Sequence, residues 1–422
     1  MNRRVNRSRG RKKQIFINRL LVLLILVLLV VGFMKFKPLI KDIAKDLGSI
    51  FGTGLGKDTE EPDIEIDDNE PIIKEPDIRN IEMVSVGDIM FHAPQLNAAN
   101  MGNGVYDFAP PFEYIKPYVE SADLALANFE TVTPENGRAY EGYPLFNSPK
   151  ESILALKETG FDILSTANNH TLDQGKVGVL NTLKYIEEYG LKSVGTYSQP
   201  NPQPLIEEVN GIKFGFLAYT YGLNGLDSRL TQEELSYMIN LIDEEKIEKD
   251  IRTMKDLDVD MVVVSIHWGN EYQRQPSDYQ IELGHKMVDW GANIILGSHP
   301  HVLQKSEIIK KDGRDNFIIY SMGNFISNQR QETMGNSYAE DGVIVRLNIE
   351  KDMDENKTRI KDVEFIPTWV HKYFVNQKPQ YRVLPLNRVI DGNLDIVLSD
   401  TVLKRVKKSF NDSMETLGEI KQ

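Results

Sequence analysis

Residues 294–302 read Ile-Ile-Leu-Gly-Ser-His-Pro-His-Val, an apolar run followed by a small-residue turn and two histidines. Such a run is typical of a buried strand that ends in a polar loop. The pattern recurs from residue 81 onward, and amphipathic stretches separate several of the runs. This strand–helix alternation predicts an α/β layered domain. The other predicted strands are Met83–Val86, Leu124–Ala127, Ile163–Ser165, Phe214–Tyr219, Met261–Ile266 and Phe317–Tyr320.

Helical periodicity is clearest in the stretches between these strands. Past about residue 342 the predicted strands Val343–Leu347 and Arg359–Glu364 follow each other more closely, and Asp400–Leu417 is predicted to form a final amphipathic helix. The other predicted helices are Lys150–Thr159, Val177–Tyr189, Glu244–Met254 and Asp278–Trp290.

The overall composition limits the classes of function. The chain has 422 residues and a formal net charge of −13. A nucleic-acid partner is not expected, because phosphate contacts need clustered Lys and Arg. The chain has no cysteine, which excludes thiolate metal sites. Any metal would therefore be held by His, carboxylate or amide oxygen, which favours Mn, Fe, Zn, Mg or Ca.

The N-terminal segment has the composition of a membrane anchor. Residues 1–14 are basic, and residues 15–36 carry an almost uncharged run of Leu, Val and Ile, close to the ~20 residues that cross a bilayer. The positive-inside rule predicts one transmembrane signal-anchor helix, with a cytoplasmic N-terminus and an extracellular main domain at the cell membrane. A cleaved signal peptide is the alternative, but no Ala-x-Ala-like site follows the run.

The rest of the chain divides into three predicted parts. Residues 37–80 contain a stretch dense in Asp and Glu with three prolines, so we expect an extended acidic stalk outside the membrane. Residues 81–375 are predicted to form the main α/β domain. Residues 376–422 are predicted to be a C-terminal extension that contains the last helix.

Polar side chains gather just past the ends of the predicted strands, where function concentrates in open α/β sheets. Four of the seven histidines lie there, together with acid and amide residues. Each motif alone is weak, because a lone carboxylate or an Asn-Asn-His turn is more often structural. The whole set predicts one site, formed by Asp88, Asn128, Glu130, Asn168, Asn169, His170, His267, Glu271, His299, His301 and Asn324.

This set of residue types is suited to divalent metals. Asp, Glu, Asn and His in one place can hold two ions that share one carboxylate. Two such ions activate a bridging water and stabilise charge on a phosphoryl or acyl group. His299 and His301 form the strongest pair, because residues two apart in an extended segment project to the same side. Their alternative role is that of two hydrogen-bonded loop histidines.

Six motifs follow the predicted strands in order: Gly-Asp-x-Met (87–90), Asn-Phe-Glu-Thr (128–131), Ala-Asn-Asn-His (167–170), His-Trp-Gly-x-Glu (267–271), Gly-Ser-His-Pro-His-Val (297–302) and Ser-Met-Gly-Asn-Phe (321–325). The series resembles the CapA family of poly-γ-glutamate capsule-synthesis proteins, a branch of the calcineurin-like metallophosphoesterases. The likeness covers about residues 82–326. It implies a metallophosphatase-like αββα sandwich, in which two facing β-sheets have helices outside.

The resemblance also implies a role for each residue. Asp88 matches the family's first-strand ligand, and Glu130 would be the carboxylate shared by two metals. Asn169 would bind the second metal through its amide oxygen. His170 would be the general acid that protonates the leaving group.

The remaining residues complete this implied arrangement. His267 and His299 would finish the second metal site and His301 the first. Substrate contacts or supports of the ligands would come from Asn128, Asn168, Glu271 and Asn324.

Two features depart from the phosphoesterase pattern. Those enzymes usually open with Asp-x-His, but Met90 stands at the position of that His. His92 is either its substitute or an ordinary loop residue. The usual second Gly-Asp is replaced by Asn-Phe-Glu at 128–130. Both departures bear on the number of metals and on phosphatase activity. His285 and His371 are interpreted as structural.

Three functions stay open at this point. The resemblance implies work on an extracellular poly-γ-glutamate capsule, with a membrane-embedded synthase and the acidic polymer as partners. The chain could be a metal-dependent hydrolase or transferase for that polymer or another envelope substrate, a non-catalytic scaffold of the synthase complex, or a general phosphoesterase acting on a cell-envelope or nucleotide substrate. An acidic polymer would be repelled by a net charge of −13 unless metal or local Lys and Arg offset it.

Overall fold

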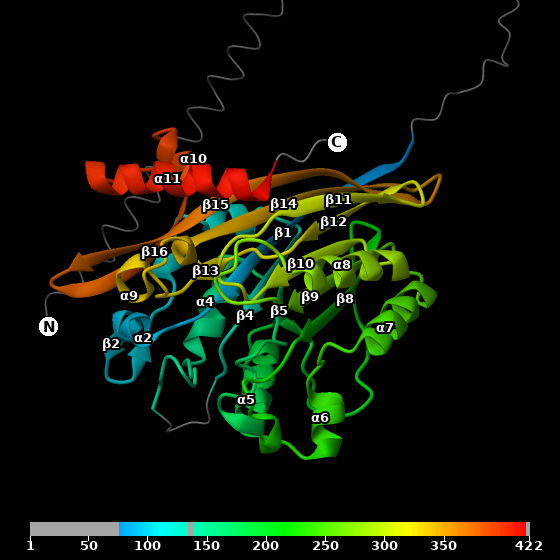
Figure 1. Cartoon of the computed structure of the whole chain (residues 1–422), viewed down its shortest axis with the longest axis horizontal. Coiled ribbons are helices and arrows are strands. Elements are labelled where there is room, and N and C mark those ends of the chain that lie inside the picture. Colours follow the sequence, from blue (N-terminus) through cyan, green and yellow to red (C-terminus); the bar gives the residue numbers. More distant parts are fainter. Residues whose placement is uncertain (1–75, 134–138, 419–422) are drawn as a thin grey trace, which may run out of the picture. The chain divides into compact units, whose positions relative to one another are not determined.

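The computed structural model describes residues 76–133 and 139–418. All of them belong to one unit of the chain, Lys74–Gln422, whose elements are drawn in Figure 1. The predicted anchor at 15–36 and nearly all of the predicted stalk lie outside the described residues, so both stay predictions. None of the helices within 76–133 and 139–418 combines the length and the apolar character needed to cross a membrane.

The larger sheet has eight strands and contains β1, which carries the first candidate site residue. The strands of one half are parallel, and three antiparallel strands form the other half. From edge to edge the order is β16 (Lys378–Pro385), β15 (Lys357–Val375), β14 (Asp341–Asp352), β1 (Ile78–Ile89), β4 (Leu124–Phe129), β5 (Ile163–Ser165) and β6 (Lys192–Val194), with β13 (Asn324–Ile326) pairing in parallel with the end of β1.

The second sheet has six strands. The four central strands are parallel, and an antiparallel strand closes each edge. The order is β11 (Ser306–Lys311), β12 (Arg314–Ile319), β10 (Ile294–Ser298), β9 (Met261–His267), β8 (Ile212–Thr220) and β7 (Leu205–Val209).

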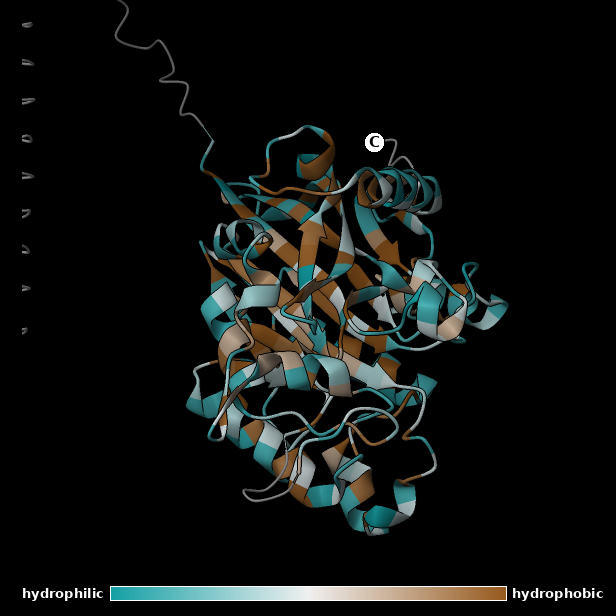
Figure 2. Ribbon diagram, turned by 90° about the vertical axis from the view of Figure 1, so that its left-hand side faces the viewer, coloured by the Kyte–Doolittle hydropathy of each residue, from teal (hydrophilic) through white to brown (hydrophobic). Residues whose placement is uncertain are grey.

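The two sheets pack face to face through one apolar core. Met83 and Leu126 of the larger sheet share a buried cluster with Phe216, Val263 and Leu296 of the smaller one. In Figure 2 the hydrophobic residues concentrate on the strands, while the helices carry hydrophilic patches. Because successive residues of a strand point to opposite faces, the neighbours of these core residues face outward toward helices.

Helices cover the outer face of the larger sheet. Leu156 of α4 (Glu151–Thr159) and Ile186 of α5 (Gly175–Glu188) share a buried cluster with Ala125 of β4. The helices therefore bury their apolar faces on the side of β4 that turns away from the second sheet.

The outer face of the smaller sheet is covered in the same way. Ile251 of α7 (Glu244–Asp256) and Leu283 of α8 (Asp278–Trp290) pack with Val264 of β9, and Figure 1 shows both helices beside β8, β9 and β10. The predicted α/β fold class is thus confirmed, with the layer order helix, sheet, sheet, helix.

Shorter elements fill the loops and the C-terminal region. The last helix lies along β14 and β15 in Figure 1 and shares a cluster with Trp369 of β15. These elements are α2 (Ala93–Ala99), β2 (Asn100–Gly102), β3 (Val105–Tyr106), η1 (Pro110–Phe112), α3 (Lys116–Glu120), η2 (Asp227–Arg229), α6 (Gln232–Met238), α9 (Gln331–Met334), η3 (Tyr338–Glu340), α10 (Leu386–Ile390) and α11 (Asp400–Leu417).

Candidate metal centre

Asp88 stands at the end of β1, between two other strands. In register it is flanked by Asn128 of β4 and Asn324 of β13. The approach of β13 is close, since a Cβ on Gly87 would lie 2.0 Å from the Gly323 carbonyl oxygen. The backbone N of Asp88 donates to that oxygen at 2.9 Å. The glycine at 87 is therefore required to bring the Asp88 carboxylate to its position.

Glu130 follows β4 and is completely buried. Its Oε1 has no hydrogen-bond partner among the described residues. That oxygen lies 3.5 Å from Nε2 of His267 and 3.7 Å from Nε2 of His301. Burial, followed by the nearby charge of Asp88, raises the pKa of Glu130 well above its usual value. Burying an ionised carboxylate among neutral imidazoles costs free energy unless a cation binds to it.

His299 and His301 reach the site from the loop after β10. Their φ angles are 95° and 56°, so the segment is not extended as we expected. Both lie in the left-handed region that non-glycine residues rarely adopt, and such strain is frequent at functional sites. The two rings still converge, with centroids 5.7 Å apart. Asn324 holds the loop, because its Nδ2 donates to the His301 carbonyl oxygen at 3.3 Å.

His267 ends β9 and meets Asn169 from the loop after β5. Its Nε2 lies 2.9 Å from Oδ1 of Asn169. Burial, followed by the charges of His299 and His301, lowers the pKa of His267 well below its usual value. Burial likewise lowers the pKa of His299 to about 2, with His301 the next cause. Both rings are therefore neutral at physiological pH, which is the form that binds metals.

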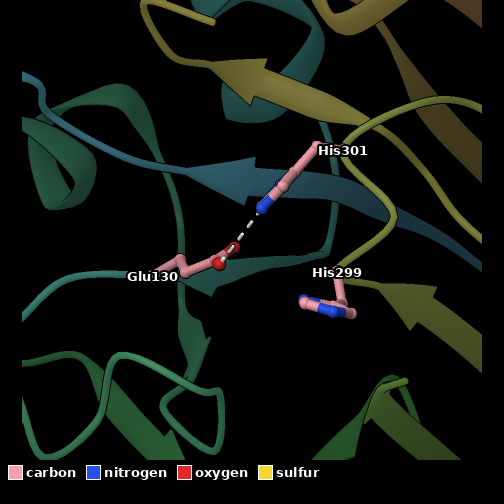
Figure 3. Close-up of side chains that lie close together, drawn as sticks. All are labelled: Glu130, His299 and His301. Carbon is pink, nitrogen blue, oxygen red and sulfur yellow. Dashed lines mark ion pairs between the residues drawn. The ribbon is translucent and has the colours of Figure 1, made fainter. Parts of the chain in front are cut away.

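Two sets of three side chains have the spacing of metal ligands, and both include Glu130. One is Glu130, His299 and His301, and the other is Asp88, Glu130 and His267. Within each set the ligand atoms lie within 4.8 Å of one another. Figure 3 shows Glu130 and His301 pointing toward each other with the His299 ring beside them.

The donor atoms of this cluster fit divalent cations. Nδ1 of His299, like Oε1 of Glu130, is buried without a hydrogen-bond partner among the described residues. Unpaired buried acceptors of this kind need an explanation. Carboxylate and imidazole are ordinary ligands of Zn, Mn and Fe. The ligand types and their spacing therefore fit a divalent cation, as the sequence indicated.

The ligands that the resemblance implied for two metals lie together in this one cluster, and their contacts connect both groups of three. His301 lies with His299 around Glu130, while His267 lies with Asp88. His301 also contacts the other group, because its Nδ1 is 3.0 Å from Oδ2 of Asp88. Glu130 is common to both sets, as expected of a shared carboxylate.

His170 is hydrogen-bonded to Asp173 beside the cluster. Its Nδ1 lies 2.7 Å from Oδ2 of Asp173, and its ring packs edge-on against Phe146 at 4.7 Å. The backbone N of Phe146 donates to the same Asp173 oxygen at 2.6 Å. Burial raises the pKa of Asp173, although the bond from His170 opposes that shift. Asp173 therefore orients the ring, a role that the sequence analysis missed.

Asn128 and Asn168 brace the acidic residues. Nδ2 of Asn128 donates to Oδ1 of Asp88 at 2.8 Å and to Oε2 of Glu130 at 3.3 Å. Nδ2 of Asn168 donates to the Phe129 carbonyl oxygen at 2.9 Å, which fixes the turn that precedes Glu130. Both amides are thus supports of the carboxylates.

Glu271 lies outside this packed group. Its residue is exposed, and no ligand set includes it among the described residues. Its charge still acts on the centre, since it is one of the groups that raise the pKa of Glu130. Glu271 also bonds Tyr272 and contributes, after burial, to the raised pKa of that phenol.

Met90 and His92 lie where the sequence departs from the phosphoesterase pattern. Met90 is buried, and its backbone N donates to the Ile326 carbonyl oxygen at 2.9 Å. Nδ1 of His92 accepts from the backbone N of Asn328 at 3.2 Å. Burial, followed by the charge of His301, lowers the pKa of His92 to about 4. One ring nitrogen of His92 is therefore already used to hold the loop at 328.

A loop that carried no motif completes the centre. Tyr221 and Asn224 follow β8, and Oδ1 of Asn224 accepts from Nδ2 of Asn169 at 3.3 Å. The ring of Tyr221 lies 4.5 Å from the ring of His299 and 6.3 Å from that of His267. Their position just past the end of a predicted strand could have identified them from the sequence, but the segment has no acidic residue or histidine near that end.

Comparison with known proteins gives one family. Residues 82–329 match the family model described as "Bacterial capsule synthesis protein PGA_cap". The chain is 31% identical over 326 residues to the "Capsule biosynthesis protein CapA" of Bacillus anthracis, covering 75% of this chain and 74% of that protein. It is also 31% identical over 309 residues to the "PGA biosynthesis protein CapA" of Bacillus subtilis (strain 168), covering 68% of this chain and 76% of that protein.

Solved structures resemble the chain more distantly. The calcineurin-like phosphoesterase YfkN from Bacillus subtilis aligns with a TM-score of 0.42 and 16% identity, covering 80% of this chain and 98% of that one. The NAD nucleotidase NadN from Haemophilus influenzae aligns with a TM-score of 0.43 and 11% identity, covering 81% and 57%. Scores this low carry no conclusion about the present chain.

Proposed function

The chain belongs to the bacterial capsule synthesis protein (PGA_cap) family, and from this membership we propose that it is a metal-dependent hydrolase or transferase of capsule biosynthesis. The observation that carries the proposal is the buried carboxylate of Glu130, which is common to two sets of potential ligands and keeps one oxygen unpartnered. Two relatives that are 31% identical to the chain support a role in capsule biosynthesis, because their names contain capsule or PGA biosynthesis.

The proposed cofactor is a pair of divalent ions, which would be held by Asp88, Glu130, His267, His299 and His301, with Glu130 common to both sets of ligands. Asn169 supports the ring of His267 and is the candidate amide ligand. Ions bound there would activate a water molecule and polarise a phosphoryl or acyl oxygen. Mn, Fe, Zn, Mg and Ca all suit these ligands to different degrees.

The chain's own groups supply proton transfer and orientation. Asp173 holds Nδ1 of His170, which leaves Nε2 of that ring to exchange a proton with a leaving group. Asn128 keeps the two carboxylates in place through its amide. The ring of Tyr221 covers His299 and His267 on the outside, so it is placed to contact a substrate that approaches the centre.

The proposed location is the outer side of the cell membrane. The basic 1–14, the apolar 15–36 and the acidic 37–80 support a single-pass anchor with an outward-facing domain. There the domain would meet a nascent acidic polymer beside a membrane-embedded synthase. Protease added to intact cells would then digest the domain, whereas survival of the domain until the cells are lysed would contradict the topology.

The catalytic proposal is tested by His299→Ala in the full-length chain. We expect loss of bound metal, loss of hydrolysis of capsule polymer or of an aryl phosphate, and failure to restore capsule in a strain that lacks the wild-type gene. The control is His285→Ala, because His285 is an exposed helix residue paired with Glu307 and lies outside the site. Full turnover by His299→Ala would refute the proposal.

A scaffolding role is the second candidate, and Met90 favours it. A buried thioether stands where the phosphoesterase pattern has a histidine ligand, and His92 is bonded to the loop at 328. If a His299→Ala variant that binds no metal still restores capsule, the domain acts by assembly with the synthase or polymer and not by catalysis.

A further inference from the structure

Two chain segments beside the metal centre contain strained backbone. His299 and His301, in the segment after β10 (Figure 3), have φ angles of 95° and 56°, and Tyr272, in the segment after β9, has a φ of 65°. Non-glycine residues rarely adopt this left-handed conformation, and it persists only where the surrounding contacts enforce it. The contacts between the two segments are therefore needed to keep the histidines in place.

The two segments are hydrogen-bonded to each other between the histidines. The backbone N of Tyr272 donates to the carbonyl oxygen of Pro300 at 2.7 Å. The ring of Tyr272 also lies 6.1 Å from the ring of His301, measured between centroids. Because Pro300 stands between the two histidines in the chain, their position depends on the course of the 269–277 segment.

A buried amide fixes that course. Gln304 follows the histidines in the chain, and its side chain is 0% exposed. Its Nε2 donates to the carbonyl oxygens of Gln273 at 2.8 Å and Gln275 at 3.3 Å. Its backbone N donates to the Ser321 carbonyl oxygen at 3.1 Å. One side chain thus ties two carbonyl groups of the 269–277 segment to the segment that carries the histidines.

A second buried amide supports the first. Gln280, the third residue of α8, is also 0% exposed. Its Nε2 donates to Oε1 of Gln304 at 2.9 Å, and its Oε1 accepts from the backbone N of Ser277 at 3.0 Å. Every side-chain N and O atom of the pair therefore has a partner. A buried polar group that is fully bonded holds its neighbours in one arrangement.

The glycine of the 267–271 motif makes room for this pair. A Cβ at Gly269 would lie 2.6 Å from Oε1 of Gln280 and 2.7 Å from its Nε2. Gly269 also has a φ of 85°, which a residue with a side chain would adopt only with strain. The motif thus contributes a ligand, His267, and the space in which the amide pair lies.

We propose that Gln304, held by Gln280, is a positioning residue of the metal centre. It fixes the 269–277 segment against the segment after β10, so that the two histidines converge toward Glu130 before an ion binds. This inference rests on the proposed function and adds to it the residues that hold the ligands in place.

The same sheet contains a matching amide pair at its opposite end. Asn293, just before β10, and Asn316, in β12, are each 4% exposed. Nδ2 of Asn293 donates to Oδ1 of Asn316 at 3.1 Å. Nδ2 of Asn316 donates to the carbonyl oxygens of Ile309 at 3.1 Å and Arg314 at 3.5 Å. Each pair thus has one amide that donates to two carbonyl groups and accepts from its partner. Only the Gln304 pair lies at the metal centre.

The test compares Gln304→Met with Asn316→Leu in the full-length chain. Each variant removes the same kinds of hydrogen bond from a buried site, so both should lower the denaturant midpoint of unfolding. Only Gln304→Met should weaken the binding of Mn²⁺ or Zn²⁺ to the metal-free chain, by about 10–100-fold, the usual effect of losing a group that supports a ligand. Asn316→Leu should bind the ion as wild type does.

Hydrogen exchange of the metal-free chains gives a second reading. The backbone N–H of Tyr272 should exchange faster in Gln304→Met than in Asn316→Leu, because its acceptor segment is released. Gln280→Met is a further variant that keeps the bonds of Gln304 to the 269–277 segment and removes only its support. It should show both effects at a smaller size, so it serves as the test if Gln304→Met does not fold.

Two results would overturn the inference and leave the proposed function intact. One is a wild-type chain that binds metal together with a Gln304→Met variant of equal affinity. The other is an equal loss of affinity in Gln304→Met and Asn316→Leu, which would make the effect one of general stability. A wild-type chain that binds no ion would instead refute the proposed function, and the inference with it.

Discussion

At the scale of single residues, burial has the largest effect on the candidate centre. Removal from water raises the pKa of Glu130 and lowers the pKa values of His267 and His299. Each group therefore favours its neutral form when no cation is present. A bound divalent ion would reverse this preference for Glu130, because its charge compensates the buried carboxylate.

The first prediction concerns Glu130→Gln in the full-length chain. The amide has the shape of the neutral carboxyl that burial favours, so the metal-free variant should keep its free energy of unfolding within about 1 kcal/mol of wild type. Its metal affinity should fall by more than about 100-fold, which is more than the loss expected when a residue that only hydrogen-bonds to a metal ligand is removed. Denaturant unfolding and metal titration measure the two quantities. The exposed Glu233→Gln on α6, which is in neither ligand set, should change neither quantity.

The second prediction separates positioning from metal binding. Asp173→Asn should lower the turnover by about 10²–10⁴-fold, the range expected when an acid–base group loses its function, because an amide no longer provides the carboxylate that orients the ring of His170. Bound metal should be unchanged, since Asp173 is in neither ligand set. Turnover equal to that of wild type in a metal-replete variant would show that Asp173 does not support catalysis through His170.

At the scale of elements, the strand ends determine which residues meet. β1, β4 and β13 bring Asp88 beside Asn128 and Asn324, and β9 pairs with β10 so that His267 lies opposite Ser298. Buried apolar runs predicted β1, β4, β9 and β10, but not β13. The predicted strand Ile163–Ser165 is β5 itself, and the predicted helix Asp278–Trp290 is α8 itself. The helix boundary was predictable because Ser277 caps the N-terminus through Gln280 and Gly291 ends it with φ 118°.

Other elements could not be predicted from their own residues. β7 and β11 are edge strands in which charged and apolar residues mix, so their local pattern resembles a loop. The left-handed backbone at His299 and His301 depends on the neighbouring strand and on Asn324. Tyr221 and Asn224 belong to the centre only because β8 ends beside β9.

The third prediction tests the loop after β8. Asn224→Ala removes the acceptor that holds the amide of Asn169, so metal affinity should fall by about 10–100-fold, the usual effect of losing an outer partner. Titration of the metal-free chain measures it. Asn201→Ala is the control, because Asn201 is exposed and lies in another loop. Equal affinities in the two variants would exclude a supporting role for Asn224.

The fourth prediction concerns the strand crossing that places Asp88. Gly87→Ala puts a methyl group 2.0 Å from the Gly323 carbonyl oxygen, so β1 and β13 must separate. We expect a loss of at least about 2 kcal/mol in unfolding free energy, typical of a backbone clash in a packed core. Gly313→Ala is a control, since no atom lies within 4 Å of its Cβ position, although its positive φ adds a smaller cost.

At the scale of the whole molecule, the C-terminal helix is joined to the larger sheet by a buried acid. Oδ1 of Asp341 in β14 accepts from Arg405 at 2.7 Å and from Ser409 at 2.6 Å. Burial raises the pKa of Asp341 to about 7, although Arg405 opposes the shift. The carboxyl is therefore protonated in the folded chain at a pH where it is ionised in the unfolded chain.

The fifth prediction follows from the sign of that shift. Because the pKa of Asp341 is raised in the folded chain, its protonation stabilises the fold fully at a pH below the ordinary pKa of aspartate. This stabilisation is lost as the pH rises through about 7. The unfolding free energy of wild type should thus contain a term that falls by a few kcal/mol between about pH 4 and 7. Asp341→Asn should lack that term. Parallel pH profiles for the two proteins would contradict it.

The family and the existence of one polar centre were both accessible from the sequence, since the spaced motifs at 87–90, 128–131 and 297–302 coincide with strand ends. The assignment of each ligand to one ion stays a prediction, because it depends on side-chain directions across two sheets. The anchor at 15–36 stays a prediction.

The most direct test of the account is the metal content of the purified full-length chain. After dialysis against Mn²⁺ or Zn²⁺, elemental analysis should find two ions per wild-type chain and none in Glu130→Gln/His299→Ala, with both proteins folded by circular dichroism. A folded wild-type chain that retains no ion, or a double variant that retains as many ions as wild type, would contradict a metal centre built on Glu130.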